Sequence, residues 1–274
     1  MSVADKTILI TGATDGVGKL VAQRLAGAGA RVLLHGRSAE KGAAVLAEIR
    51  AITGKDKLDY FRADFAALDE VRAMADAVAA RHERIDILIN NAGIGGGVKG
   101  AMRRETSRDG HELRFAVNYL APFLLTHRLL PTLRRSAPAR IVNVASAGQY
   151  PLDFDDIMLE RGYEGMRAYR QSKLAQIMFT ADLATELGDA GVTVNSLHPA
   201  TLMNTRMVFE SFGHAMSTVE EGADAILYVA TSPDLDGKTG LYFDGKEPAR
   251  ANAQADDDSA RRRLRELSLK LTEP

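Results

Sequence analysis

Seven short apolar segments recur along the chain, and their content of Ile, Leu and Val is typical of β-strands. The predicted strands are residues 6–11, 30–36, 57–64, 85–91, 139–146, 192–199 and 240–245. Several of them are apolar at nearly every position rather than at every second one. Because this pattern is typical of strands buried on both faces, it indicates a parallel sheet covered by helices on either side.

Longer segments with helical periodicity separate these strands. In residues 17–30, apolar side chains such as Val17 and Val21 recur every three or four positions and form one stripe. Residues 67–82 and 112–135 show the same pattern. Strands that alternate with helices are connected by right-handed crossovers. We therefore predict an α/β fold with one doubly wound parallel sheet of about seven strands and helices on both faces.

Composition narrows the functional classes. The chain has 274 residues, a formal net charge of −1 and no cysteine. The length suits one α/β domain, and the charge gives no electrostatic reason to bind nucleic acid or an anionic membrane. The six histidines show no metal-binding spacing, so we expect no metal. Since neither a signal-peptide pattern nor a membrane-spanning apolar run occurs, we expect a cytoplasmic protein.

Three glycines lie between the first predicted strand and the first predicted helix. Gly12, Gly16 and Gly18 allow the backbone to turn sharply and to approach a phosphate closely. The helix that follows offers free N–H groups and the positive end of its dipole. Because the turn opens a βαβ unit, it favours a dinucleotide site; a tight structural turn is the alternative.

The end of the second predicted strand bears on the choice of dinucleotide. Proteins that bind NAD commonly place a carboxylate here, against the ribose hydroxyl groups. This chain has Gly36 instead, followed by Arg37 and Ser38. A guanidinium binds the 2′-phosphate that a carboxylate would repel, and a serine hydroxyl can add a hydrogen bond. We therefore expect NADP(H) to be favoured over NAD(H); an arginine that merely faces solvent is the alternative.

A tyrosine and a lysine, Tyr169 and Lys173, are four positions apart in a helical segment and so share one face. A nearby cation favours the phenolate, so Lys173 would lower the tyrosine pKa from about 10. A solvated helix face is the alternative for this pair alone. Ser146, at the end of the fifth predicted strand, favours a catalytic role, because strand carboxyl ends line the ligand crevice of such a sheet. Asn118, an amide in an apolar helix, forms a structural hydrogen bond or holds a water beside the lysine.

Together these motifs resemble the short-chain dehydrogenase/reductase family over residues 5 to 247 or so. The motifs are Thr11-Gly12-x-x-x-Gly16-x-Gly18, Asp64, Asn90-Asn91-Ala92-Gly93, Asn118, Ser146 and Tyr169-x-x-x-Lys173. The resemblance implies a single Rossmann-type domain over residues 1–274. Within it we expect a cofactor part at about 1–145, a catalytic and substrate part at about 146–250 and a C-terminal helix at about 255–271.

The resemblance also implies roles for individual residues. Tyr169 would be the general acid/base, and Ser146 would orient the substrate oxygen. Lys173 would lower the pKa of Tyr169 and bind the nicotinamide ribose, while Asn118 would hold a water of the proton relay. The implied cofactor-binding residues are Gly12, Thr14, Asp15, Gly16, Val17, Gly18, Arg37, Ser38, Asp64 (at the adenine), Phe65, Asn91, Ala92, Gly93, Tyr169, Lys173, Pro199 and Thr201.

A finer likeness points to the retinol-dehydrogenase-like and protochlorophyllide-reductase-like branch. It is carried by the segments NYLAPFLLT, FDDIM and YRQSKLAQIMF and by the C-terminal tail.

Two positions depart from the family pattern. Pro199 is followed by Ala200 where a glycine is usual, and Asp15 stands where many NADP users have a basic residue. Residues 200–216, which contain Met and Phe, suit a cover over an apolar ligand or form an ordinary connection.

We therefore expect an oxidoreductase that transfers hydride between NADP(H) and a carbonyl or secondary alcohol of a small, apolar or aromatic substrate. Enone or imine reduction and a non-catalytic dinucleotide-binding sensor are the alternatives. Residues 94–104, 147–166 and 200–216 should shape the substrate pocket. Family members often form homodimers or tetramers through helices at 111–134 and 167–188, so we expect a homo-oligomer; the branch also includes monomers. A small-molecule substrate is the other expected partner.

Overall fold

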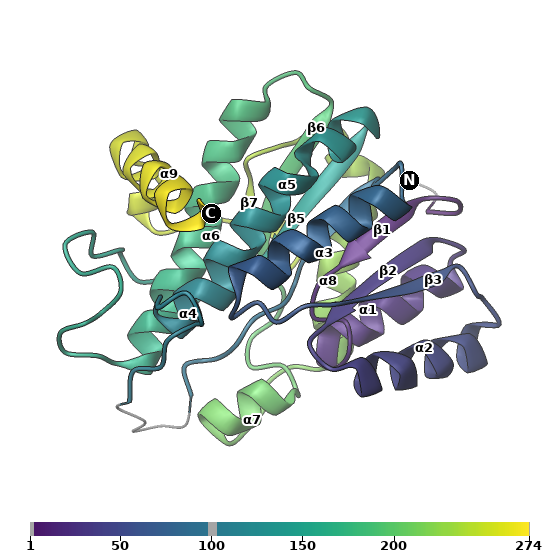
Figure 1. The fold of residues 1–274 in the computed structure, drawn as a ribbon, viewed down its shortest axis with the longest axis horizontal. Helices are drawn as coiled ribbons and strands as arrows, with labels where there is room; N and C mark the ends of the chain where they lie inside the picture. Colours follow the sequence, from purple (N-terminus) through teal and green to yellow (C-terminus); the bar gives the residue numbers. More distant parts are fainter. Residues whose placement is uncertain (1–2, 98–102, 274) are drawn as a thin grey trace.

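The computed structural model describes residues 3–97 and 103–273. Within them, eight strands form one sheet in the order β3-β2-β1-β4-β5-β6-β7-β8 (Figure 1). The strands are β1 (Thr7–Ile10), β2 (Arg31–Gly36), β3 (Leu58–Arg62), β4 (Ile87–Asn90), β5 (Ala139–Val144), β6 (Val192–His198), β7 (Tyr242–Asp244) and β8 (Glu247–Pro248). All neighbours are parallel except β7 and β8. The predicted doubly wound parallel sheet is confirmed, and β8 adds a two-residue antiparallel edge.

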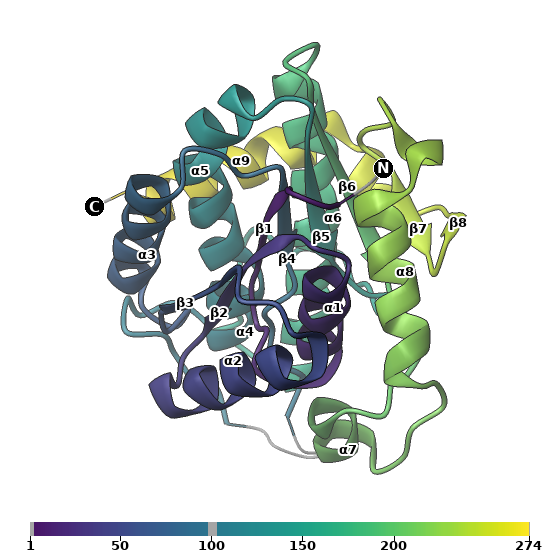
Figure 2. The same ribbon diagram turned by 90° about the vertical axis from the view of Figure 1, so that its right-hand side faces the viewer.

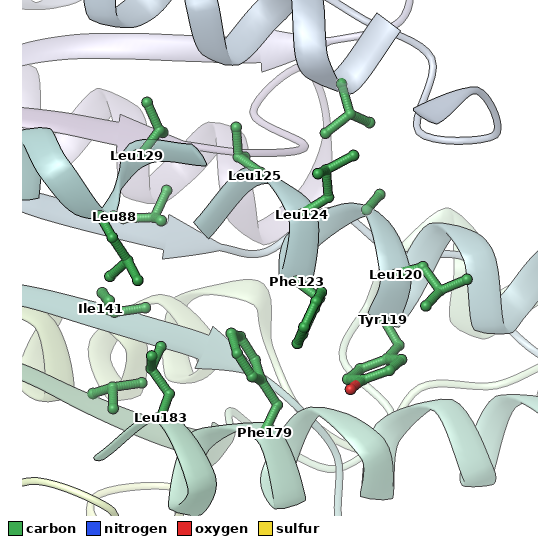
Figure 3. Packing of buried hydrophobic residues seen from close by; sticks show 14 of the residues in the cluster. Leu88, Tyr119, Leu120, Phe123, Leu124, Leu125, Leu129, Ile141, Phe179 and Leu183 are labelled. Carbon is green, nitrogen blue, oxygen red and sulfur yellow. The ribbon is translucent and has the colours of Figure 1, made fainter. Parts of the chain in front are cut away.

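Helices cover both faces of the sheet (Figure 2). One layer contains α1 (Gly16–Gly27), α2 (Ala39–Thr53) and α8 (Val219–Thr231); the other contains α3 (Leu68–Arg81), α5 (Ala121–Arg135) and α6 (Gly165–Leu187). Successive side chains of a strand point to opposite faces. Ile8 therefore packs in the α1 layer and Leu9 in the α5 layer. Figure 3 shows the second layer, where Phe123 and Phe179 pack between α5 and α6. Their ring centroids are 5.1 Å apart.

The helix predicted at 112–135 is interrupted. It begins as one turn, α4 (Leu113–Phe115), widens into a π-helical turn, η1 (Ala116–Leu120), and continues as α5. In the wide turn the N–H of Ala121 donates to the carbonyl of Ala116, five residues back. The apolar pattern continues through this region, so periodicity alone does not reveal the change. Turns of this kind often occur at functional sites, and Asn118 lies within this one.

The C-terminal segment forms η3 (Ala253–Asp256) and α9 (Asp258–Thr272), close to the predicted helix at 255–271. Helix α9 packs against α6 and η1. The hydroxyl groups of Tyr119 and Ser268 lie 2.7 Å apart, and both side chains are buried. Arg72 also donates a hydrogen bond of 2.8 Å to the Thr272 carbonyl. Helix α9 is thus fixed to the layer that contains α3, α5 and α6. Among the described residues, no helix is both long and apolar enough to cross a membrane.

Candidate functional site

The predicted site residues gather where the strand order reverses, at the carboxyl ends of β1 and β4. The Thr11 hydroxyl oxygen accepts hydrogen bonds from the N–H groups of Asn91 and Ala92, each 3.0 Å long. In return, the Asn91 amide donates to the carbonyl groups of Thr11, at 2.9 Å, and Gly12, at 3.1 Å. The two motifs are therefore tied together at the switch point, where ligands bind in open α/β sheets.

The glycines of the turn are required by close backbone packing. Gly12 has φ +67°, and a Cβ atom there would lie 2.8 Å from the Cα of Ala92. A Cβ at Gly18 would lie only 2.3 Å from the Gly12 carbonyl oxygen. Asp15 caps α1 by accepting a 2.8 Å hydrogen bond from the Gly16 N–H. The close packing thus places the backbone of the turn directly at the N-terminus of α1, where the N–H groups and the helix dipole fit the pyrophosphate of a dinucleotide.

At the end of β2, the space in which an acidic side chain would lie is filled. A Cβ at Gly36 would lie 2.6 Å from the Thr14 methyl group and 2.9 Å from the Tyr60 hydroxyl. Arg37 is exposed and has no acidic partner among residues 3–97 and 103–273. Ser38 caps α2 by accepting a hydrogen bond from the Lys41 N–H, so its own hydroxyl proton stays available. These groups fit a phosphate better than a ribose hydroxyl.

The His35 side chain is hydrogen-bonded to the backbone of the glycine turn. Its Nδ1 accepts from the Gly12 N–H at 3.3 Å, and its Nε2 lies 3.1 Å from the Ala63 carbonyl oxygen. Burial lowers the pKa of His35 to about 4, so the ring is neutral. The ring stacks on Phe65 at 4.2 Å, which places the Phe65 side chain in the core and leaves its backbone for any cofactor contact. The Asp64 carboxylate accepts from the N–H two residues further on.

Tyr169 and Lys173 share a face of α6, as their spacing predicts. The Lys173 Nζ lies 5.8 Å from the centroid of the Tyr169 ring. Ser146, which follows β5, makes a hydrogen bond to Tyr169 that lowers the tyrosine pKa, but burial raises that pKa by more. The Ser146 hydroxyl oxygen also accepts a 3.0 Å hydrogen bond from the Gly148 N–H. Two groups able to polarise or protonate a substrate oxygen, the hydroxyls of Ser146 and Tyr169, therefore meet beside Lys173 at the carboxyl edge of the sheet.

Lys173 is held inside the protein. Its Nζ donates to the Val144 carbonyl and to the Gln176 side chain, each at 2.9 Å. Because the charged form loses its hydration, burial lowers the pKa of Lys173 to about 7. Lys173 is not among the groups that shift the pKa of Tyr169 in this structure. Its expected effect on the tyrosine therefore stays a prediction.

Asn118 fixes the loop after β4. Its amide nitrogen donates to the Ile94 carbonyl at 3.0 Å and to the Ser172 hydroxyl at 2.9 Å. Its oxygen accepts from the Ile94 N–H at 2.8 Å. A Cβ at Gly93 would lie 3.2 Å from the Asn118 oxygen and 3.6 Å from the Lys173 Nζ, so glycine allows these groups to approach. The structural hydrogen bonds are confirmed, and the water-holding role stays a prediction.

The segment after β6, residues 200–216, is called the cover segment below; its expected role over a ligand stays a prediction. It contains a short helix, α7 (Arg206–Phe212). A Cβ at Gly95 would lie 3.0 Å from the Met207 side chain, and one at Gly16 would lie 3.4 Å from Thr205. The segment therefore reaches from the phosphate turn to the loop after β4. No residue of α7 is buried. The exposed apolar side chains of the cover segment are Met207, Phe209, Phe212 and Met216.

The start of the cover segment follows Pro199. Ala200 does not have a positive φ, so a side chain is accepted where the family usually has glycine. The Thr201 hydroxyl lies 3.1 Å from His198 Nε2. Pro199 and Thr201 thus follow the carboxyl end of β6. Their contact with a cofactor stays a prediction.

Sequence reasoning missed a buried ionic cluster beside the site. Arg114 donates a 3.2 Å hydrogen bond to the Gly95 carbonyl, and its guanidinium lies 3.7 Å from the Glu112 carboxylate. The Tyr163 hydroxyl donates to the same carboxylate at 3.0 Å. The cluster joins α4, the loop after β4 and the segment before α6. The signal available in the sequence for this cluster was the presence of charged residues at the start of an apolar helix.

Of the predicted pocket segment 94–104, residues 98–102 lie outside the described residues.

Comparisons with known proteins agree with this geometry. A family model described as short chain dehydrogenase matches residues 6–214. Retinol dehydrogenase 13 of Mus musculus is 36% identical over 282 residues, covering 96% of this chain and 82% of that protein. Retinol dehydrogenase 11 of Homo sapiens is 36% identical over 278 residues, covering 97% and 85%.

Among solved structures, a chain from Mycobacterium paratuberculosis, titled as uncharacterized, is similar with a TM-score of 0.81 and 29% identity, covering 99% of this chain and 94% of that one. A chain from Shigella flexneri, titled as a short chain dehydrogenase complexed with NADP, is similar with a TM-score of 0.72 and 28% identity. That match covers 89% of this chain and 99% of that one.

Proposed function

Because the chain belongs to the short-chain dehydrogenase/reductase family and is therefore an oxidoreductase, we propose that it interconverts a carbonyl and a secondary alcohol, with NADP(H) as cofactor. The observation that carries the proposal is the meeting of Ser146, Tyr169 and Lys173 at the carboxyl edge of the sheet. A site that only bound a dinucleotide would have no use for an acid beside a polarising hydroxyl.

In this proposal the chain supplies the proton and the orientation. The Ser146 hydroxyl donates a hydrogen bond to the substrate oxygen, and Tyr169 transfers its proton to that oxygen as the carbonyl is reduced. In the oxidative direction Tyr169 removes the same proton. When bound, the nicotinamide supplies or accepts the hydride at the carbonyl carbon. Lys173, with its Nζ 5.8 Å from the tyrosine ring centroid, is placed to favour the phenolate whenever it carries its proton.

The preference for NADP(H) is supported by the end of β2. Gly36 cannot be replaced by an acid without a clash with Thr14 and Tyr60, and Arg37 offers an unpaired guanidinium. Solved relatives titled as short chain dehydrogenases were complexed with NADP or NADPH. A related 3-ketoacyl reductase was complexed with NADH, so the fold accepts either cofactor and these side chains must decide.

The substrate is expected to be apolar or aromatic. Met207 and Phe209 are 36% and 48% exposed on a segment that packs over the loop after β4, and such side chains can close over an apolar molecule. The retinol dehydrogenases among the relatives suggest that a long apolar aldehyde such as retinal belongs in the substrate screen. A cytoplasmic location is part of the same proposal.

The test is a paired measurement on Tyr169→Phe. With NADPH and a panel of ketones, aldehydes and retinal, followed at 340 nm, the variant should lose at least about 10²-fold in kcat, because the proton donor is removed. NADPH binding, measured by calorimetry, should stay within about threefold. Tyr228→Phe, a tyrosine on α8 away from the site, is the matched control and should keep full activity. Undiminished turnover in Tyr169→Phe would refute the proposal.

Product analysis separates the alternatives on the same scaffold. An α,β-unsaturated ketone should yield the allylic alcohol if the carbonyl is reduced, and the saturated ketone if the enone is reduced. An imine substrate should not be consumed. If NADPH binds but no substrate in the panel is turned over, the non-catalytic sensor becomes the better description.

A further inference from the structure

We propose that Arg62, at the end of β3, is a second binding residue for the 2′-phosphate of NADP(H) and acts together with Arg37. This inference rests on the proposed function and deepens it, because it names a residue of the neighbouring strand that helps to set the choice between the two cofactors. Neither the motif spacing nor the family resemblance singles out Arg62.

The register of the sheet places Arg62 beside the end of β2. Strands β2 and β3 are parallel, and Gly36 is paired directly with Arg62. Paired residues of parallel strands project to the same face of the sheet. Tyr60, two residues earlier on β3, projects to that face too, and its hydroxyl lies 2.9 Å from the position of a Cβ at Gly36. Arg62 therefore occupies the face on which the carboxylate of an NAD-binding protein would stand.

The guanidinium of Arg62 is directed toward the end of β2. Its Nε donates a 3.3 Å hydrogen bond to the Arg37 carbonyl. The charge of Arg62 also acts on the nearby Tyr60 hydroxyl, whose pKa it lowers against a larger rise caused by burial. The Tyr60 hydroxyl in turn donates to the Ser38 carbonyl at 2.7 Å, which fixes the wall behind the site. Among residues 3–97 and 103–273, the two Nη atoms of Arg62 make no hydrogen bond, so they are available for a ligand.

Neither arginine is neutralised. Both are exposed, and neither has an acidic partner in residues 3–97 and 103–273. By contrast, Arg31 and Arg81, also near β3, both pair with Asp59. Two unpaired guanidinium groups on adjacent strand ends suit a group with nearly two negative charges and three acceptor oxygens. A ribose hydroxyl has no charge and one acceptor oxygen, so it would leave both positive charges uncompensated.

The experiment measures binding rather than turnover. Calorimetry with NADPH, NADH, adenosine 2′,5′-bisphosphate and AMP is carried out on wild type, Arg62→Gln and Arg62→Lys. In Arg62→Gln, affinity for the two 2′-phosphorylated ligands should fall about three- to thirtyfold, the range for an exposed to a charged hydrogen bond. Affinity for NADH and AMP should stay within about twofold, and Arg62→Lys should restore most of the loss.

Two further variants separate the outcomes. Arg262→Gln removes an exposed arginine from α9, on the opposite side of the molecule from α2 (Figure 1), and should leave all four affinities unchanged. Arg37→Gln tests the underlying proposal. If Arg37→Gln weakens NADPH binding and Arg62→Gln does not, or if Arg62→Gln weakens NADH equally, the inference about Arg62 is wrong. If neither variant alters the NADPH to NADH ratio, the proposed cofactor preference fails as well.

Discussion

Replacement of Lys173 by methionine should make the cofactor-free protein more stable relative to wild type at pH 7 than at pH 9.5. Burial lowers the lysine pKa from 10.5 to about 7, so the unfolded chain binds a proton in this range that the folded protein does not. Stability contributed by such a group falls as the pH decreases from about 10.5 to about 7 and is constant below. Methionine has a similar length and no charge, so the variant lacks this dependence.

The magnitude follows from the two pKa values. At roughly 1.4 kcal/mol per pKa unit, the proton linkage of Lys173 costs about 4 kcal/mol at pH 7 and about 1 kcal/mol at pH 9.5. The stability difference between the variant and wild type should therefore change by about 3 kcal/mol between these pH values. The lost hydrogen bonds to Val144 and Gln176 shift this difference at any one pH. Because their loss is common to both conditions, it has little effect on the change with pH.

Urea unfolding of both proteins without cofactor at the two pH values gives the four free energies required. Lys55→Met, a change at an exposed lysine, controls for the loss of one lysine from the unfolded chain. The same Lys173→Met protein should have almost no turnover. A stability difference that is the same at pH 7 and pH 9.5 would show that Lys173 is not held in a charge-excluding environment, and the reasoning would be refuted.

Two other predictions concern packing. Gly18→Ala places a methyl group 2.3 Å from the Gly12 carbonyl oxygen, so it should weaken NADPH binding more than about tenfold in calorimetry and cost about 1–3 kcal/mol in urea unfolding. Gly27→Ala on the same helix meets its nearest neighbour at 3.7 Å and should be tolerated; equal behaviour of the two would contradict the steric argument. Tyr119→Phe removes the hydrogen bond to Ser268 and should cost about 1 kcal/mol without changing kcat.

The sheet and the central pair could be predicted because both depend on local pattern. Continuous apolar runs mark buried strands wherever they occur, and a spacing of four residues places Tyr169 and Lys173 on one helix face before any tertiary contact is known. The glycine turn could also be predicted, since its place between a strand and a helix is visible in the chain. These features required no knowledge of which strands are neighbours.

The rest depends on contacts between distant segments. The π-helical turn at Asn118 leaves no mark in the apolar periodicity. Arg114 is an ordinary charged residue until the Gly95 carbonyl, 19 positions away, is brought to its guanidinium. Arg62 becomes a candidate only when the register of β2 and β3 pairs it with Gly36. The low pKa of Lys173 likewise results from its burial in the folded protein, and no pattern in the sequence indicates that burial.

The fifteen residues of α9 have a consequence for assembly and for handling the protein. They lie on α6 and on the π-helical turn before α5, within the helices through which self-association would be expected. Two copies that joined through the part of α6 beneath α9 would have to displace α9, with loss of the buried Leu264 and Ser268 contacts. The length of the chain at its carboxyl end would then control subunit number. A protein shortened by the length of α9 would expose the surface of α6 and η1 that α9 covers, and it would tend to associate there. An affinity tag added beyond the exposed Glu273 would leave α9 in place.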